Sequence, residues 1–129
     1  MRILLADDHP IVRRHVRHIL EAEPGWRVCA EAVTGREAVD MTTAERPDII
    51  VLDVSMPELS GLQAAKLIHE AFPEIDIIIL TMHEPFELRG QLVPSVRACI
   101  QKTDLQLLVD AVREVSQIHS RDRVEVPHA

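Results

Sequence analysis

The sequence predicts a doubly wound α/β fold, in which helices cover both faces of a parallel sheet, and three observations support this prediction. Short runs of branched apolar residues recur along the chain, as expected for strands that are buried on both faces. Segments with helical spacing of apolar residues alternate with these runs, and proline or glycine stands at several of the boundaries. A chain of 129 residues with a hydrophobic fraction of 47% is also large enough for one domain with a substantial core.

The apolar runs are predicted to be five strands. They cover residues 3–6, 26–30, 49–52, 75–80 and 96–100. The third and fourth runs consist almost entirely of isoleucine, leucine and valine, which is typical of the central strands of a parallel sheet. Because aromatic residues make up only 2% of the chain, aliphatic side chains must fill the core.

The segments that follow the strands are predicted to be five helices. They cover residues 10–23, 35–45, 62–72 and 84–93, and a last segment that ends near residue 118. Pro10 suits the first turn of its helix, and Thr34 and Asp104 are candidate N-caps for the second and the last. The fourth helix is expected to be weak, because Gly90 costs it about 1 kcal/mol and Pro94 ends it early.

The alternation of strands and helices predicts the order of the sheet. Parallel strands with right-handed crossovers are expected, and the flavodoxin-like strand order 2-1-3-4-5 is the usual solution at this size. Residues 1–118 are expected to form this domain. Residues 119–129 are polar and are expected to be a linker or a disordered tail.

Composition argues against several classes of function. The net charge is -7 and there is no basic run, so we expect no DNA binding by this chain alone. No apolar run approaches membrane-spanning length and no signal peptide precedes the first strand, which predicts a cytoplasmic protein without a membrane contact. Cys29 and Cys99 lie in strand-like runs and are expected to be buried free thiols, not a disulfide or a metal site.

Polar side chains stand at the ends of four predicted strands. They are Asp7 and Asp8 after the first strand, Asp53 after the third, Thr81 after the fourth and Lys102 shortly after the fifth. In the order 2-1-3-4-5 these strands are neighbours, so their ends meet at the edge where open α/β sheets bind ligands. Asp53 alone could simply end a strand or cap a turn, but the five residues together predict a functional site.

Three carboxylates and one ammonium group favour phosphate chemistry with a metal ion. Two like charges 4 Å apart repel by about 4 kcal/mol at an effective dielectric constant of about 20. Magnesium (Mg²⁺) would relieve this repulsion, since it binds carboxylates, waters and phosphate oxygens. An aspartate at such a site can attack phosphorus as a nucleophile. Mg²⁺, Lys102 and the Thr81 hydroxyl would then each hold one oxygen of the phosphoryl group.

Four segments resemble the receiver domain of two-component response regulators. They are Leu-Leu-Ala-Asp-Asp-His-Pro at 4–10, Ile-Val-Leu-Asp-Val-Ser-Met-Pro-Glu-Leu-Ser-Gly at 50–61, Ile-Leu-Thr-Met-His at 79–83 and Ile-Gln-Lys-Thr-Asp at 100–104. The resemblance covers about residues 1–117. It is strongest to the NarL/FixJ (LuxR-type) subfamily, whose full-length members carry a C-terminal helix-turn-helix.

The resemblance implies roles in phosphoryl transfer. Asp53 would be the phosphoacceptor, and the donor would be a phosphohistidine on a sensor histidine kinase or a phosphotransfer protein. Lys102 would pair with the phosphoryl group, and Thr81 would move to hydrogen-bond it. The domain would not be an enzyme beyond catalysing its own phosphorylation and its own slow dephosphorylation.

The resemblance also implies a set of Mg²⁺ ligands and two positions that tune the site. Asp8 would bind the ion directly and Asp7 largely through water, while Asp53 and the main-chain oxygen of Ser55 would complete the protein ligands. Ser55 and His83 occupy the positions that tune hydrolysis of the acyl phosphate in the family. His83 could equally be a solvated loop residue.

One departure from the family pattern concerns the output of the switch. Family members usually carry Tyr or Phe three residues before the lysine, and rotation of that ring reports phosphorylation; here the residue is Cys99. The acceptor site is therefore expected to be intact. The output face, made of the fourth helix, the fifth strand and the fifth helix, is expected to be atypical.

These inferences lead to one expected function and two alternatives. The expected function is a phosphorylation switch that controls an output domain. The output is expected to be transcriptional regulation through a C-terminal helix-turn-helix absent from this chain. Phosphorylation could also produce a homodimer. The first alternative is an interaction module that binds partners without phosphorylation. The second is a phosphatase with an aspartate nucleophile, but such enzymes need a second acid where this chain has Ser55.

Overall fold

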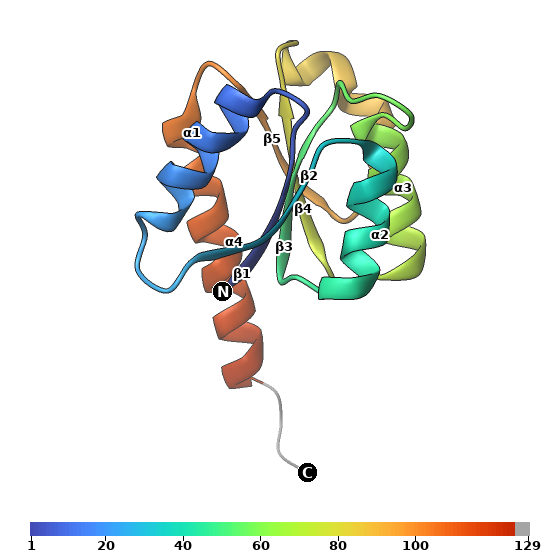
Figure 1. Cartoon of the computed structure of the whole chain (residues 1–129). Helices are drawn as coiled ribbons and strands as arrows, with labels where there is room; N and C mark the ends of the chain where they lie inside the picture. The colour runs from blue at the N-terminus through green and yellow to red at the C-terminus, as the bar shows by residue number, and fades with distance from the viewer. Residues whose placement is uncertain (126–129) are drawn as a thin grey trace.

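Five parallel strands form the central sheet of the computed structural model, which describes residues 1–125 (Figure 1). The strands are β1 (Arg2–Ala6), β2 (Arg27–Ala32), β3 (Ile49–Asp53), β4 (Asp76–Thr81) and β5 (Val96–Gln101). Their order is β2-β1-β3-β4-β5, and each neighbouring pair is parallel. The predicted order is confirmed, so the carboxyl ends of β1, β3, β4 and β5 lie at one edge.

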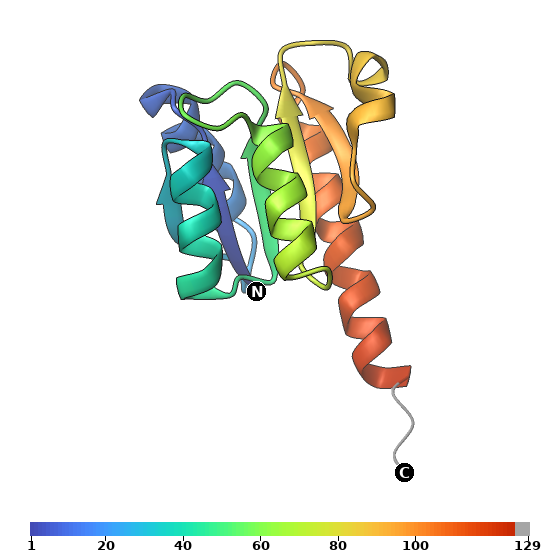
Figure 2. The same ribbon diagram turned by 90° about the vertical axis from the view of Figure 1, so that its right-hand side faces the viewer.

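Helical segments cover both faces of the sheet. They are α1 (Pro10–Glu21), α2 (Gly35–Glu45), α3 (Gly61–Ala71), η1 (Pro85–Gln91) and α4 (Leu105–Glu125). Helices α1 and α4 cover one face, and α2 and α3 cover the other (Figures 1 and 2). Both faces of the sheet are therefore covered by helices, as a doubly wound fold requires.

The core consists of two apolar layers, one on each side of the sheet. Successive strand residues point to opposite faces, so each continuous apolar run supplies both layers. The layer under α2 and α3 includes Leu4, Ile50, Leu52, Ile77 and Ile79. The layer under α1 and α4 includes Ile3, Leu5, Ile49, Val51, Ile78 and Leu80. All these side chains are fully buried, which confirms the interpretation of the runs as central strands.

Two predicted N-caps are confirmed, and a third cap fixes the start of α3. The Thr34 hydroxyl accepts a hydrogen bond from the Glu37 N–H at 3.0 Å, and Asp104 Oδ1 accepts one from the Leu107 N–H at 3.4 Å. At α3 the Ser60 side chain accepts from the main-chain N–H of residue 63, whose side chain accepts in return from the Ser60 N–H. This capping box satisfies two amide groups at the start of α3, directly after the loop that follows β3.

The fourth helical segment is a 3-10 helix, not an α-helix. The sequence predicts a weak helix over residues 84–93, and the structure has η1 over Pro85–Gln91. Leu92 already has an extended conformation (φ -94, ψ 131), so the helical segment ends before Pro94. Leu88 is buried in the core layer under α2 and α3 and anchors this segment there.

Helix α4 is longer than the sequence analysis expects. The predicted end lies near residue 118, but the helix continues to Glu125 and extends past the edge of the sheet (Figure 2). No proline or glycine stands between residues 119 and 126, so nothing in the sequence breaks the helix before Pro127. The first part of the expected linker is therefore helical, and residues 126–129 lie outside the described residues. Within residues 1–125, no helix combines the length and the apolar character that a membrane span needs.

Candidate functional site

Carboxylates from the ends of β1 and β3 lie together at the carboxyl edge of the sheet. Asp7 is fully buried, Asp53 is 2% exposed and Asp8 is partly exposed. One ligand atom from each of these residues, together with one from His9, fits within a group whose members lie within 4.8 Å of one another. The fold thus assembles the three acids that the sequence analysis predicts as a site.

Lys102 bridges two of these carboxylates. Its Nζ lies 2.9 Å from Asp7 Oδ2 and 3.0 Å from Asp53 Oδ2, and its side chain is 7% exposed. The Lys102 N–H donates to the Thr81 carbonyl at 2.9 Å, so the pairing of β4 with β5 continues to the lysine and fixes its position. The ammonium group is therefore placed between the first and third strands by the backbone of the fifth.

The local charges shift the pKa values of Lys102 and Asp53. Burial opposes the charge of Lys102, but its contacts with Asp7 and Asp53 outweigh burial and raise the lysine pKa above its ordinary value. Burial raises the pKa of Asp53; Lys102 opposes this shift, and the nearby Asp7 adds to it. Lys102 is therefore protonated at neutral pH. A bound metal cation would add positive charge and so favour the ionised form of Asp53.

The acidic group fits a hard divalent cation. One oxygen each of Asp7, Asp8 and Asp53 is shielded from solvent and faces a basic group: Lys102 Nζ lies 2.9 Å from Asp7 Oδ2 and 3.0 Å from Asp53 Oδ2, and His9 Nδ1 lies 3.0 Å from Asp8 Oδ1. Carboxylates this close together repel one another, and a divalent cation would relieve that repulsion. Carboxylate oxygens in such a cluster are the ligands that Mg²⁺ prefers, so these three side chains could hold it.

Thr81 ends β4 at the same edge. Its side chain is fully buried, and its Oγ1 accepts a hydrogen bond from the His83 N–H at 2.9 Å. Because the hydroxyl oxygen accepts this bond through a lone pair, the hydroxyl proton can still be donated to another acceptor. Thr81 thus ends the strand next to β3, and its hydroxyl can donate one hydrogen bond.

The other predicted site residues have different surroundings. Ser55 is exposed in the loop after β3, and its N–H donates to Asp53 Oδ1 at 3.4 Å. The His83 side chain is 59% exposed, and its Nδ1 lies 3.8 Å from Glu87 Oε2 in η1. Cys99 is half-buried against the core layer under α2 and α3, and burial raises the pKa of its thiol. The expectation of free thiols is confirmed for both cysteines, which are half-buried and not fully buried.

His9 and Gly61 also lie at the site, although the pattern of polar residues at strand ends does not predict them. His9 Nδ1 lies 3.0 Å from Asp8 Oδ1, and the position directly after two aspartates was the available signal. Gly61 begins α3, and a Cβ built there would lie 2.0 Å from the carbonyl oxygen of Asp53. Its N–H donates to the Val54 carbonyl at 2.8 Å. Gly61 therefore lets α3 start in backbone contact with the end of β3.

The fold and the site together define a class of protein. A doubly wound sheet of order β2-β1-β3-β4-β5, with acids after β1 and β3 and a lysine after β5, is a flavodoxin-like domain with an acidic site at its carboxyl edge. The family model for the response regulator receiver domain matches residues 3–113, and the chain belongs to this family.

Relatives and solved structures place the chain near the LuxR-type regulators. It is 41% identical over 121 residues to the oxygen regulatory protein NreC of Staphylococcus epidermidis, with 91% of this chain and 55% of that protein covered. It is 40% identical over 117 residues to the response regulator UvrY of Escherichia coli, with 89% and 54% covered. A two-component response regulator of the LuxR family from Aurantimonas has a TM-score of 0.81 at 31% identity, with 96% of this chain and 98% of that chain covered.

These comparisons establish the general role of the chain. It is the receiver domain of a two-component response regulator, a signalling domain of a kind that is generally not an enzyme. Such domains typically interact with histidine kinases and typically bind Mg²⁺ at an acidic pocket. Other relatives are named as transcriptional regulatory proteins, and the chain spans about half of their length.

Proposed function

We propose that the chain accepts a phosphoryl group on Asp53 and thereby controls an output domain that regulates transcription. The donor would be a histidine kinase or a phosphotransfer protein, and the output domain would be a C-terminal helix-turn-helix as in the LuxR-type regulators. The observation that carries this proposal is the position of Lys102 Nζ, 3.0 Å from Asp53 Oδ2 and 2.9 Å from Asp7 Oδ2 at a buried edge. A structural ion pair would need only one of these carboxylates.

The proposed chemistry assigns one task to each side chain. A carboxylate oxygen of Asp53 attacks the phosphorus of the phosphohistidine, the phosphorus–nitrogen bond breaks, and the imidazole leaves with the bonding electrons and takes up a proton. Lys102 then pairs with an oxygen of the transferred group, and the Thr81 hydroxyl donates to another. Asp7, Asp8, Asp53 and the main-chain oxygen of Ser55 would hold Mg²⁺, which when bound neutralises charge on the phosphoryl oxygens.

Phosphorylation at Asp53 can be tested with a small donor. We expect wild type to gain one phosphoryl group, measured by mass, on incubation with acetyl phosphate and Mg²⁺, and Asp53→Asn to gain none because the amide is not a nucleophile. Asp110→Asn is the matched control, since Asp110 is an exposed aspartate on α4 and should not affect labelling. Equal labelling of Asp53→Asn and wild type would refute the assignment.

Metal binding by the acidic group predicts a gain in stability. Mg²⁺ at about 100 times its dissociation constant should raise the free energy of unfolding by about 2.7 kcal/mol, because only the folded chain brings the carboxylates together. Asp8→Ala should remove this gain, whereas Asp110→Ala should keep it. Thermal unfolding with and without Mg²⁺ measures both, and an Asp8→Ala variant that keeps the full gain would exclude Asp8 from the ligand set.

We also propose that the switch acts through η1 and β5, not through rotation of an aromatic ring. The Cys99 thiol is too small to replace the ring that rotates in other family members. A movement of Thr81 on phosphorylation must therefore reach the surface through other residues. The Thr81 hydroxyl is bonded to the His83 N–H, and Gln101 Nε2 lies 3.3 Å from the His83 carbonyl and 3.3 Å from Glu84 Oε1. These contacts join the end of β4, the start of η1 and the end of β5. The face of η1, β5 and α4 would be the surface for a partner or a homodimer.

Hydrogen exchange tests this proposal for the switch. The amides of residues 84–93 should exchange fast in the free protein, because a 3-10 helix has poor hydrogen-bond geometry. Beryllium fluoride with Mg²⁺, a mimic of the phosphoryl group, should slow their exchange. If these amides are as protected as those of β4 beforehand, or are unchanged by the mimic, the proposed route is wrong.

The replacement of the family aromatic by Cys99 also supports a second candidate function. A receiver that interacts with partners independently of phosphorylation would not need the rotating ring. The labelling experiment separates the two candidates, since a wild type that gains no phosphoryl group from acetyl phosphate and Mg²⁺ would favour this module.

A further inference from the structure

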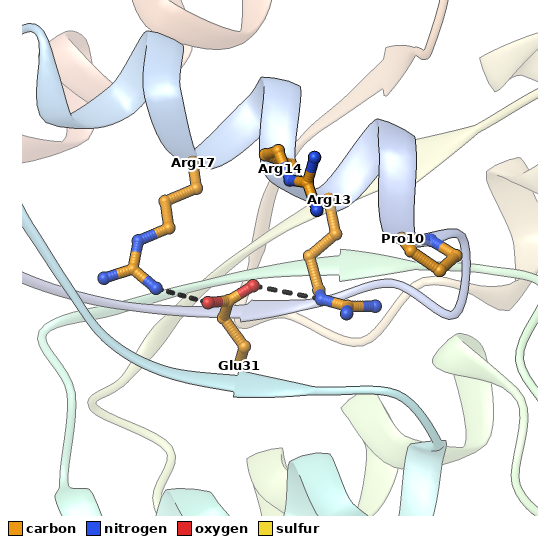
Figure 3. Close-up of a pocket in the computed structure, with 5 residues that line it drawn as sticks. All are labelled: Pro10, Arg13, Arg14, Arg17 and Glu31. Atoms are coloured by element: carbon orange, nitrogen blue, oxygen red, sulfur yellow. Dashed lines mark hydrogen bonds and ion pairs between the residues drawn. The ribbon is translucent and has the colours of Figure 1, made fainter.

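A cleft between α1 and β2 lies beside the acidic group. It has a volume of about 280 Å³ and is lined by Pro10, Arg13, Arg14, Arg17 and Glu31. Figure 3 shows the carboxylate of Glu31 between two guanidinium groups. Arg13 Nε donates to Glu31 Oε1 at 3.0 Å, and Arg17 Nη1 donates to Glu31 Oε2. Glu31 therefore orients two arginines of α1 from the neighbouring strand.

The two arginines differ in their second contact. Arg13 Nη1 donates to the main-chain oxygen of Asp7 at 2.9 Å, and its side chain is 19% exposed. Arg17 Nε donates instead to Glu21, one turn further along α1, and its side chain is 44% exposed. Arg13 thus joins Glu31 to the acidic group, whereas Arg17 joins it to the surface of α1.

The contact from Arg13 holds the peptide group that connects Asp7 and Asp8. The Asp7 N–H donates to the Ala32 carbonyl at 3.0 Å, and Asp7 Oδ1 accepts from the His9 N–H at 2.9 Å. The Arg13 contact fixes the carbonyl, which is the other polar backbone group of Asp7. Without this contact the Asp7–Asp8 peptide could rotate and turn Asp8 away from Asp7. Arg13 bonds the carbonyl and Glu31 at once through two different nitrogens of its planar guanidinium group.

We infer that Arg13 is a positioning residue for the Mg²⁺ site, acting through the Asp7–Asp8 peptide and oriented by Glu31. This inference rests on the proposed function, because it presupposes that Asp7 and Asp8 are metal ligands. The predicted change in Mg²⁺ affinity has the opposite sign to the change that charge alone would cause. Removal of a cation close to the acidic group should by charge alone favour Mg²⁺ binding, so weaker binding without Arg13 would report lost geometry.

The test compares Arg13→Ala with Arg17→Ala in the full chain. Both variants remove one cation and one bond to Glu31, but only the first releases the Asp7 carbonyl. Calorimetric titration with Mg²⁺ well below the unfolding temperature should give about a tenfold higher dissociation constant for Arg13→Ala. Arg17→Ala should bind as wild type does. Arg13→Lys should be intermediate, since it keeps the charge and one of the two contacts.

The outcomes separate this inference from the proposed function. If wild type binds Mg²⁺ but Arg13→Ala binds as well as wild type, or no more weakly than Arg17→Ala, Arg13 has no positioning role. If Asp8→Ala binds Mg²⁺ as wild type does, the metal site itself is wrongly assigned. Urea unfolding of both arginine variants without Mg²⁺ gives their stabilities. A similar loss in the two, with weaker binding only in Arg13→Ala, supports the inference.

Discussion

Lys102→Met is expected to lower the free energy of unfolding by about 3 kcal/mol at pH 7 without divalent cations. The substitution leaves the carboxylates of Asp7 and Asp53 facing each other at a buried edge, where the two are 0% and 2% exposed. Loss of one partner of a buried ion pair typically costs about 3–5 kcal/mol. We expect the lower end of this range because Asp53, whose pKa burial already raises, can take up a proton. Urea unfolding in the presence of a chelator measures the effect.

A double variant tests the cause of this loss. Asp53→Asn added to Lys102→Met removes one of the two facing charges and should restore most of the stability. Asp53→Asn alone should be more stable than wild type at pH 7. The pKa of Asp53 is higher in the folded state than in the unfolded state. The contribution of Asp53 to the free energy of unfolding is therefore fully present below the unfolded-state pKa, and it is lost as the pH rises through the folded-state pKa. A Lys102→Met variant as stable as wild type would show that the lysine does not offset the charge of the two acids.

Gly61→Ala is expected to lower the free energy of unfolding by about 3 kcal/mol and to reduce phosphorylation of Asp53. The added Cβ would lie 2.0 Å from the Asp53 carbonyl oxygen and 2.7 Å from its carbonyl carbon. Both are backbone atoms, so relief requires a shift of α3 or of the end of β3. Overpacking typically costs about 1–3 kcal/mol, and a collision between two backbones should lie at the top of that range. Urea unfolding and acetyl phosphate labelling measure the two effects.

Gly90→Ala is the matched control for Gly61→Ala. A Cβ at Gly90 meets no heavy atom within 4 Å, and its backbone is not in the left-handed region. This variant should therefore be neutral or gain up to about 1 kcal/mol, because alanine restricts the unfolded chain. If the two variants have the same stability, the close approach of α3 to β3 is not a constraint on the fold.

The strands and the acidic group could be predicted because they depend on local pattern and on chain order. A run such as residues 49–52 can be satisfied only by burial on both faces, and parallel strands bring their carboxyl ends to one edge. Once the order is 2-1-3-4-5, Asp53 and Lys102 must be close although 49 positions separate them. The approximate bounds of the strands follow from the same argument.

Other features depend on packing between elements, which a linear pattern does not contain. The contact of Arg13 with Glu31 joins two surface-type residues whose distance depends on how α1 lies on β2. The need for glycine at position 61 comes from the path of β3, not from an unusual backbone angle. The sequence pattern predicts helical structure over residues 85–91, but it does not distinguish a 3-10 helix from an α-helix. The length of α4 could have been inferred from the absence of a helix breaker before Pro127.

Helix α4 starts beside the acidic edge at Leu105 and ends beyond the opposite edge of the sheet at Glu125 (Figures 1 and 2). Its 21 residues make a rod about 30 Å long, at about 1.5 Å per residue. A small change in the orientation of the first turn of such a rod is amplified into a larger displacement of its last turn. A tilt of only about 2° there would displace the far end by about 1 Å, given that length. A change too small to alter the packing of the sheet could therefore still reposition any segment joined to the last turn. The direction of that displacement would also depend on helical phase, because each residue inserted into the rod would rotate the attached segment by about 100° around the axis.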